Sequence, residues 1–333
     1  MTDLGPEVEA IYWSEFNYLG LGKDFAGVEE ATRKLITAGR AAAALDMIGL
    51  YSDPGESSRA VAELVASGLE ALLEESQGKE RFGRLDTYHF QRLFAILANR
   101  RGDLGEARVV GLEFQYFPAL GFEADAPSLH RAMLEDPGFF VELVTLAYRE
   151  DDEAGSRDCP ADGEDSERQR SIATRAYEVL HSLRQCPGGS PEGDLDGEVL
   201  GEWIRDAREQ LVAVGRSRIG ESQIGQVLAQ APAETDSSPI HPVVLQIIED
   251  LDSDAVEHGF EVGFYNKRGM STRAILEGGT REREAAEVLR KQAVQTGASP
   301  RARNMLNRLA DSYESEARRE DRSAERRHQG LDW

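Results

Sequence analysis

Hydrophobic residues recur at helical spacing through almost the whole chain, whereas the alternation typical of strands is nearly absent. In the segment 41–51, for example, Ala44, Leu45 and Ile48 fall on one side of a helix. Glycine, proline and capping residues separate such segments, so the pattern predicts an all-α fold. We expect helices over residues 7–16, 25–38, 41–51, from a cap at Ser57 or Ser58 to 75, 88–99, 104–116, from 139 onward, 168–184, 197–214, 221–230, 242–251, 253–266, 280–295 and 300–327.

Two helix–turn–helix segments, 37–51 and 99–114, resemble each other. Both place a small or polar turn before a helix with alanine and leucine at close spacing. Small residues at tight crossings are how tetratricopeptide-like and other α-solenoids stack. Because no regular repeat length is kept along the chain, the pattern predicts an irregular helical-repeat array. An ordinary helical domain is the alternative.

An acidic segment interrupts the helices. Residues 150–167 carry nine acidic residues against one basic residue, Arg157, and almost no hydrophobic ones. Such a segment cannot bury enough surface to offset the entropy lost on ordering. We therefore predict a flexible linker at 150–167 between an N-terminal helical lobe, 1–149, and a C-terminal helical lobe, 168–333.

Charge and composition limit the classes of partner. The net charge is −23, and a field that negative repels phosphate backbones, which disfavours broad nucleic-acid binding but leaves room for a local basic patch. No apolar run is long enough to span a membrane, and the N-terminus lacks the pattern of a secretory signal. Two cysteines, Cys159 and Cys186, are too few for a disulfide framework. We expect a cytoplasmic protein.

Glycine and arginine are concentrated in the segment 259–284. A helix is expected to end near residue 266, and a highly charged helix is expected to begin near residue 280. Arginine offers planar donors for carboxylates or phosphates, and glycines at a helix N-terminus let an anion approach the backbone amides. The predicted partner-binding site consists of Tyr265, Asn266, Lys267, Arg268, Arg273, Glu277, Gly278, Gly279 and Arg281.

The same residues allow a purely structural interpretation. Arg268 and Arg273 are equally suited to pair with Glu277 or Glu282 inside the protein, because arginine–carboxylate pairs often hold a chain where it reverses direction. Both interpretations stay open at this point.

Motifs for catalysis and for metal binding are absent or weak. There is no P-loop and no G-x-S-x-G elbow. His181 and Cys186 lie five residues apart, which is poor evidence for either a zinc site or a nucleophile pair. We expect no metal and no cofactor, and we expect Trp203 to be a core residue.

The final helix, 300–327, carries opposite charges three and four residues apart, which favours a solvent-exposed helix. Its apolar positions end at about Ala317. The tail beyond is expected to project or to fray unless a partner covers it.

Three stretches, 218–234, 259–269 and 277–284, followed by the helix 309–321, resemble the C-terminal helical region of a group of large bacterial multidomain proteins. The resemblance extends from about Asp86 to the C-terminus. Some proteins of this group resemble sensors of antiphage defence, in which an N-terminal effector or NTPase precedes a helical sensor array. The chain lacks that large N-terminal portion, so we expect either a standalone subunit or an excised domain.

These observations favour a non-catalytic helical interaction, scaffold or sensor module in a larger bacterial assembly. Its expected partner is a protein, such as an NTPase or nuclease effector. One alternative is a nucleic-acid-associated subunit that uses the arginine-rich C-terminal third. Another is an enzyme with an unrecognised site around Arg268 and Glu277.

Overall fold

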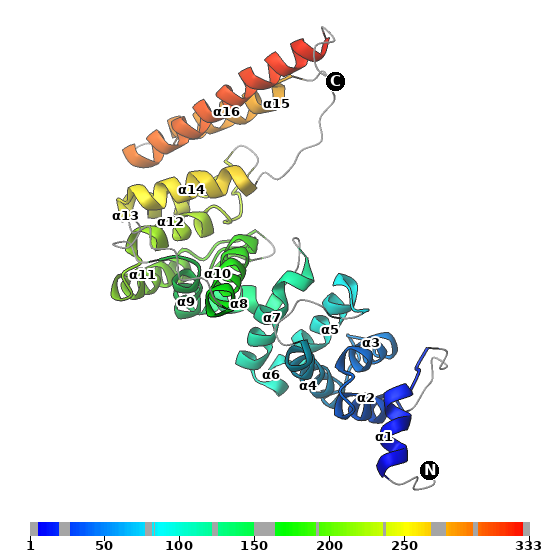
Figure 1. Cartoon of the computed structure of the whole chain (residues 1–333). Helices are drawn as coiled ribbons and strands as arrows, with labels where there is room; N and C mark the ends of the chain where they lie inside the picture. Colours follow the sequence, from blue (N-terminus) through cyan, green and yellow to red (C-terminus); the bar gives the residue numbers. More distant parts are fainter. Residues whose placement is uncertain are drawn as a thin grey trace. The chain divides into compact units, whose positions relative to one another are not determined.

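The chain is all-α over the part that the computed structural model describes, as the sequence predicts. The described residues are 6–19, 27–76, 82, 84–121, 126–149, 164–190, 193–235, 238–267, 278–295 and 299–328. They form sixteen helices and no strand, with only two isolated bridges. The helices group into two compact units, Met1–Ala132 and Met133–Trp333 (Figure 1). None of the described helices is both long and apolar enough to cross a membrane.

The first unit contains the helices α1 to α8. Their bounds are α1 (Pro6–Glu15), α2 (Val28–Thr37), α3 (Ala41–Tyr51), α4 (Arg59–Ser76), α5 (Thr87–Asn99), α6 (Arg101–Leu104), α7 (Glu106–Leu120) and α8 (Pro127–Glu135), the last of which crosses into the second unit.

Capping side chains mark where two of these helices, α4 and α5, begin. Ser58 Oγ accepts the amide of Val61 at 3.1 Å, so Ser58 rather than Ser57 caps α4. Asp86 caps α5 by accepting the amide of His89 at 3.1 Å. Each cap satisfies an amide that the first turn of a helix leaves without an intrahelical partner.

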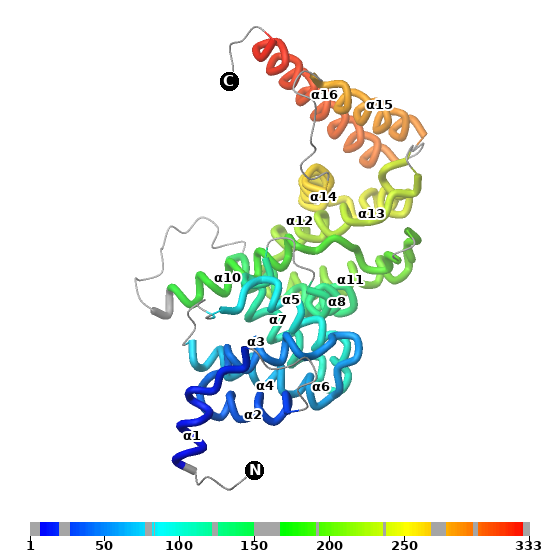
Figure 2. Tube along the Cα trace, turned by 90° about the vertical axis from the view of Figure 1, so that its right-hand side faces the viewer, coloured from blue at the N-terminus to red at the C-terminus, as the bar shows by residue number. Residues whose placement is uncertain are grey.

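From α2 to α7, the helices of the first unit pack on their neighbours in the chain and on the next helix but one. The helix α2 contacts α3 and α4, and α3 contacts α4 and α5, whereas α5 contacts α7. Figure 2 shows α1 beside α2 at one end of this unit. Buried apolar side chains from these helices form its core, including Leu35, Leu45, Leu69, Phe90 and Tyr116.

Two details of the first unit differ from the prediction. Between the expected helices 88–99 and 104–116 lies the short helix α6, which includes Gly102 and Asp103, and α7 continues through Pro118 to Leu120. Pro118 removes one backbone hydrogen bond from the last turn of α7, and the burial of Phe117 and Leu120 keeps this turn on the core. The break between α6 and α7 comes at Gly105, whose φ of 88° is left-handed and favours glycine.

The second unit contains the remaining helices. Their bounds are α9 (Pro137–Ala147), α10 (Glu164–Ser182), α11 (Gly197–Ala213), α12 (Ser217–Leu228), α13 (Pro242–Leu251), α14 (Asp254–Lys267), α15 (Thr280–Gln295) and α16 (Pro300–His328).

Packing in the second unit begins with α9, which contacts α10, α11 and α12. Phe140 of α9 lies 4.9 Å from Trp203 of α11, centroid to centroid, and the Trp203 indole donates to the carbonyl of Met133 at 3.1 Å. Trp203 is therefore a core residue, as predicted. The predicted linker at 150–167 falls within the second unit; residues 150–163 lie outside the described residues, and α10 begins at Glu164.

The C-terminal helices form two pairs, α12 with α14 and α15 with α16, and α16 also contacts α13 and α14 (Figure 1). Ala317 is the last buried residue of α16. This confirms that the apolar face of the final helix ends there.

Candidate functional site

One face of α14 is committed to packing on α12. A Cβ atom on Gly259 would collide with the carbonyl oxygen of Ser222, and one on Gly263 would lie 2.9 Å from the Cα of Gln226. Gly225 of α12 is equally close to the backbone of α14. The glycines of the sequence 259–263 therefore let two helices cross at backbone distance rather than leaving room for a ligand.

The C-terminal end of α14 carries three of the predicted site residues. Tyr265 is 40% exposed, with its ring centroid 6.0 Å from that of Tyr313 on α16. Asn266 is also exposed. This end of the helix thus presents an aromatic and an amide side chain at the surface, where a partner can reach them.

Lys267 is an exposed residue whose ammonium group contacts the backbone of another segment. Its Nζ donates to the carbonyl of Ala231 at 2.7 Å, and partial burial around the ammonium lowers the pKa of Lys267. The thiol of Cys186 is buried nearby, and this burial raises the pKa of Cys186 to about 11, although the positive charge of Lys267 lowers it somewhat. Lys267 therefore joins α14 to the segment at Ala231, and the Cys186 thiol stays protonated near neutral pH.

The predicted glycine pair lies at the start of α15, against α16. Gly278 has a φ of 63°, and a Cβ atom on Gly279 would collide with the backbone of Ala317. The amide of Gly279 donates to Asp321 Oδ1 at 2.9 Å, and Asp321 also forms an ion pair with Arg283. These two contacts, the amide first, hold the pKa of Asp321 below its ordinary value. A carboxylate of the chain itself thus takes the place expected for a bound anion.

Three of the predicted residues, Arg268, Arg273 and Glu277, lie outside the described residues. Glu282, which follows on the first turn of α15, is fully buried. A carboxylate buried this deeply requires hydrogen bonds or a cation. Arg281 is exposed. The predicted site as a whole stays a prediction.

An ion-pair cluster that was not predicted docks α16 on α14. Glu257 is 7% exposed and pairs with Arg301 at 2.8 Å and with Arg308. Arg308 also pairs with Glu261 at 2.7 Å, and partial burial raises the pKa of Glu261. Glu249 of α13 accepts the first amides of α16. No local sequence signal identifies these pairs, because their members lie far apart in the chain.

A second unpredicted cluster links three segments of the first unit. The hydroxyl of Tyr18 donates to Asp46, which is 5% exposed. The ring of His89 lies between two carboxylates, with Nε2 3.2 Å from Asp46 and Nδ1 2.7 Å from Asp86. Burial raises the pKa of Tyr18. The arrangement ties the segment after α1 to α3 and α5.

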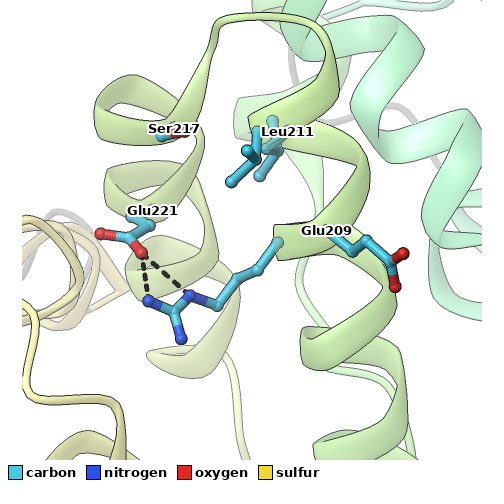
Figure 3. A pocket seen from close by; sticks show the side chains of 6 residues that line it. Glu209, Leu211, Ser217 and Glu221 are labelled. Atoms are coloured by element: carbon cyan, nitrogen blue, oxygen red, sulfur yellow. Dashed lines mark hydrogen bonds and ion pairs between the residues drawn. The ribbon is translucent and has the colours of Figure 1, made fainter.

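Two shallow pockets lie among the described residues. One, of about 240 Å³, lies between α11 and α12 and includes Arg208 and Glu221. Both oxygens of Glu221 are engaged, one by two nitrogens of Arg208 at 2.9 and 2.5 Å and the other by Ser253 at 2.6 Å. Figure 3 shows Glu209 pointing away from this pair. The pocket thus presents a neutralised ion pair rather than an open charge.

The other pocket, of about 390 Å³, lies between α2 and α4. Ile36, Ala60 and Leu64 provide its apolar part, and Arg33 and Glu63 lie at its edge. Neither pocket contains the predicted site residues, and no group of three or more potential metal ligands occurs in the described part of the chain.

Comparison with known protein families, with curated proteins and with solved structures finds no match to this chain.

Proposed function

We propose that the chain is a non-catalytic helical interaction module, built as an irregular array of helical hairpins. It serves as a scaffold or sensor subunit in a larger bacterial assembly of the kind found in antiphage defence. Its partner is a protein, such as an NTPase or nuclease effector. The observation that carries the proposal is the order of packing in the first unit.

In helical-repeat proteins each hairpin contacts its neighbours, so helices that are two apart in the chain also touch. The first unit has this order, with α2 against α4 and α3 against α5. The shallow pocket between α2 and α4 has an apolar floor and a charged edge. Surfaces formed by successive hairpins are where proteins of this architecture bind their partners.

The test is isolation of the tagged protein from a lysate of its native host, with and without phage challenge. The proposal expects a stoichiometric protein partner under at least one condition. Loss of that partner from an Arg268→Ala/Arg273→Ala variant would assign the contact to the predicted loop, and its retention would assign the contact to another surface. A monomer without a partner under both conditions would overturn the proposal.

A further inference from the structure

The outer face of α1 is apolar. Val8, Ile11 and Tyr12 are 50%, 66% and 50% exposed. Positions three and four residues apart share one side of a helix, so the three side chains form a continuous stripe. We refer to Val8, Ile11 and Tyr12 as the α1 stripe.

The opposite face of α1 is anchored to the first unit. Trp13 is buried in the core, and the guanidinium of Arg40 donates to the carbonyls of Trp13 at 2.8 Å and Phe16 at 2.9 Å. Lys34 pairs with Glu9 at 2.6 Å, and this contact lowers the pKa of Glu9. Because α1 is held from one side, the α1 stripe is presented outward in a defined orientation.

A stripe of this kind is unusual at the end of a helical array. Terminal helices need a polar outer face to remain soluble, because no further hairpin covers them. The helix α1 lies at an end of the first unit, as Figure 2 shows, yet its outward side chains are apolar. A surface with these properties is suited to continuing the array by one more helix.

The charges around the stripe define the chemistry of that helix. Glu7 and Glu15 are exposed at the two ends of the stripe. They are eight positions apart, which is about 12 Å along a helix. A second copy of α1 would bring acidic residues against acidic residues, and an anionic membrane surface would be repelled in the same way.

We propose that the α1 stripe binds an amphipathic helix of a partner protein, with lysine or arginine residues on both sides of its apolar face. Two of these basic residues, about 12 Å apart, reach Glu7 and Glu15. This inference rests on the proposed function and adds the surface and the chemistry of the partner. It does not involve the predicted loop at 268–277.

The test uses the full chain and two synthetic amphipathic helices of about 16 residues. Both peptides carry the same leucine stripe, flanked by lysine in one and by glutamate in the other. Binding is followed by fluorescence anisotropy of the labelled peptide. We expect the lysine peptide to bind, and the glutamate peptide to bind at least about tenfold more weakly.

Two variants and a matched control locate the contact. Ile11→Glu is expected to weaken binding of the lysine peptide at least about tenfold, and Glu7→Lys/Glu15→Lys is expected to reverse the preference between the peptides. Leu50→Glu, at a side chain 54% exposed on α3, should change neither. Circular dichroism confirms that each variant is folded; the substituted side chains are all at the surface.

Several outcomes would overturn this assignment. They are equal binding of the two peptides, binding of neither, no effect of Ile11→Glu, self-association that Ile11→Glu abolishes, and binding to phosphatidylserine vesicles that depends on Ile11. If the peptides fail but the Ile11→Glu protein still captures a stoichiometric partner from the lysate, the interaction module stands and only the role of α1 is wrong.

Discussion

The helix α1 and the C-terminal hairpin α15–α16 use their side chains in opposite ways. The helix α1 buries Trp13 and turns Ile11 and Tyr12 outward. The hairpin buries most of its apolar side chains, although Val294 is 83% exposed, and it pairs several charges internally, as in the contact of Arg290 with Glu314 and Asp311. The helix α1 leaves apolar side chains exposed that a partner can cover. In the α15–α16 hairpin, many charged side chains are already paired with each other.

This difference shows why a conspicuous sequence is not by itself a site. Glycine and arginine near 278–283 suggest an anion-binding site, yet Gly279 and Arg283 both contact Asp321 of the same hairpin. The α1 stripe looks ordinary in the sequence, because valine, isoleucine and tyrosine are common core residues. Its exposure becomes evident only when the face that packs is known.

The largest effect is expected where the C-terminal region packs most tightly. Gly259→Ala should lower the free energy of unfolding of the second unit by about 3 kcal/mol or more, because its Cβ atom meets the backbone of Ser222, which cannot move aside as a side chain can. The measurement is the urea midpoint, followed by the fluorescence of Trp203 in a Trp13→Phe/Trp333→Phe background so that Trp203 is the remaining tryptophan.

Gly201→Ala is the matched control, since Gly201 lies inside α11 and a Cβ atom there meets nothing within 4 Å. It should be neutral or stabilising by about 0.5 to 1 kcal/mol. Equal behaviour of the two variants would mean that α12 and α14 do not cross at backbone distance.

A smaller loss is expected from the ion-pair cluster that docks the hairpin. Glu257→Gln leaves Arg301 and Arg308 facing each other without a shared carboxylate. We expect a loss of about 2 kcal/mol, below the value for a fully buried pair because Arg308 is half exposed. Thermal unfolding at neutral pH measures it.

The control is Glu287→Gln, which removes an exposed pair with Lys291 within α15. It should leave the unfolding midpoint unchanged. If Glu257→Gln also left the unfolding midpoint unchanged, the hairpin would be held by its apolar contacts alone.

The helices were largely predictable because their signals are local. The predicted bounds 41–51, 242–251 and 280–295 match α3, α13 and α15. The start of α13, for example, is signalled by two adjacent residues, with His241 as the cap and a proline at the first helical position.

The candidate sites were less predictable because they depend on pairings between distant segments. Gly259 is explained only by Ser222 on another helix, and Glu257 only by arginines 44 and more residues away. Helical periodicity identifies an apolar face but does not say whether another helix covers it, which is why the α1 stripe was missed.

A local effect is expected in the helix α1. Arg40→Ala removes the donors to the carbonyls of Trp13 and Phe16, so α1 should detach while the rest of the first unit stays folded. Hydrogen exchange followed by mass spectrometry should show at least about tenfold faster exchange confined to residues 6–16.

Arg33→Ala is the control, because the Arg33–Glu30 pair is exposed and lies within α2. It should leave exchange in α1 unchanged. Faster exchange throughout the first unit of the Arg40→Ala protein would instead make Arg40 a support of the whole unit. The α1 stripe would then lose its defined orientation only through general unfolding.

The smallest effect is a pH dependence of the hairpin. The amide of Gly279 and the charge of Arg283 hold the pKa of Asp321 below its ordinary value of 3.8. A depressed carboxyl pKa contributes stability that is present above the ordinary pKa and is lost as the pH falls through the lower, folded value. The difference in thermal midpoint between the unsubstituted chain and Asp321→Asn should therefore be constant from neutral pH to about pH 5 and should shrink below about pH 4. A difference that stayed the same at every pH would show that the asparagine side chain destabilises the hairpin through its shape. In that case the charge of Asp321 would contribute nothing to the start of α15, and the close approach of Gly279 to the backbone of Ala317 would hold the two helices together there.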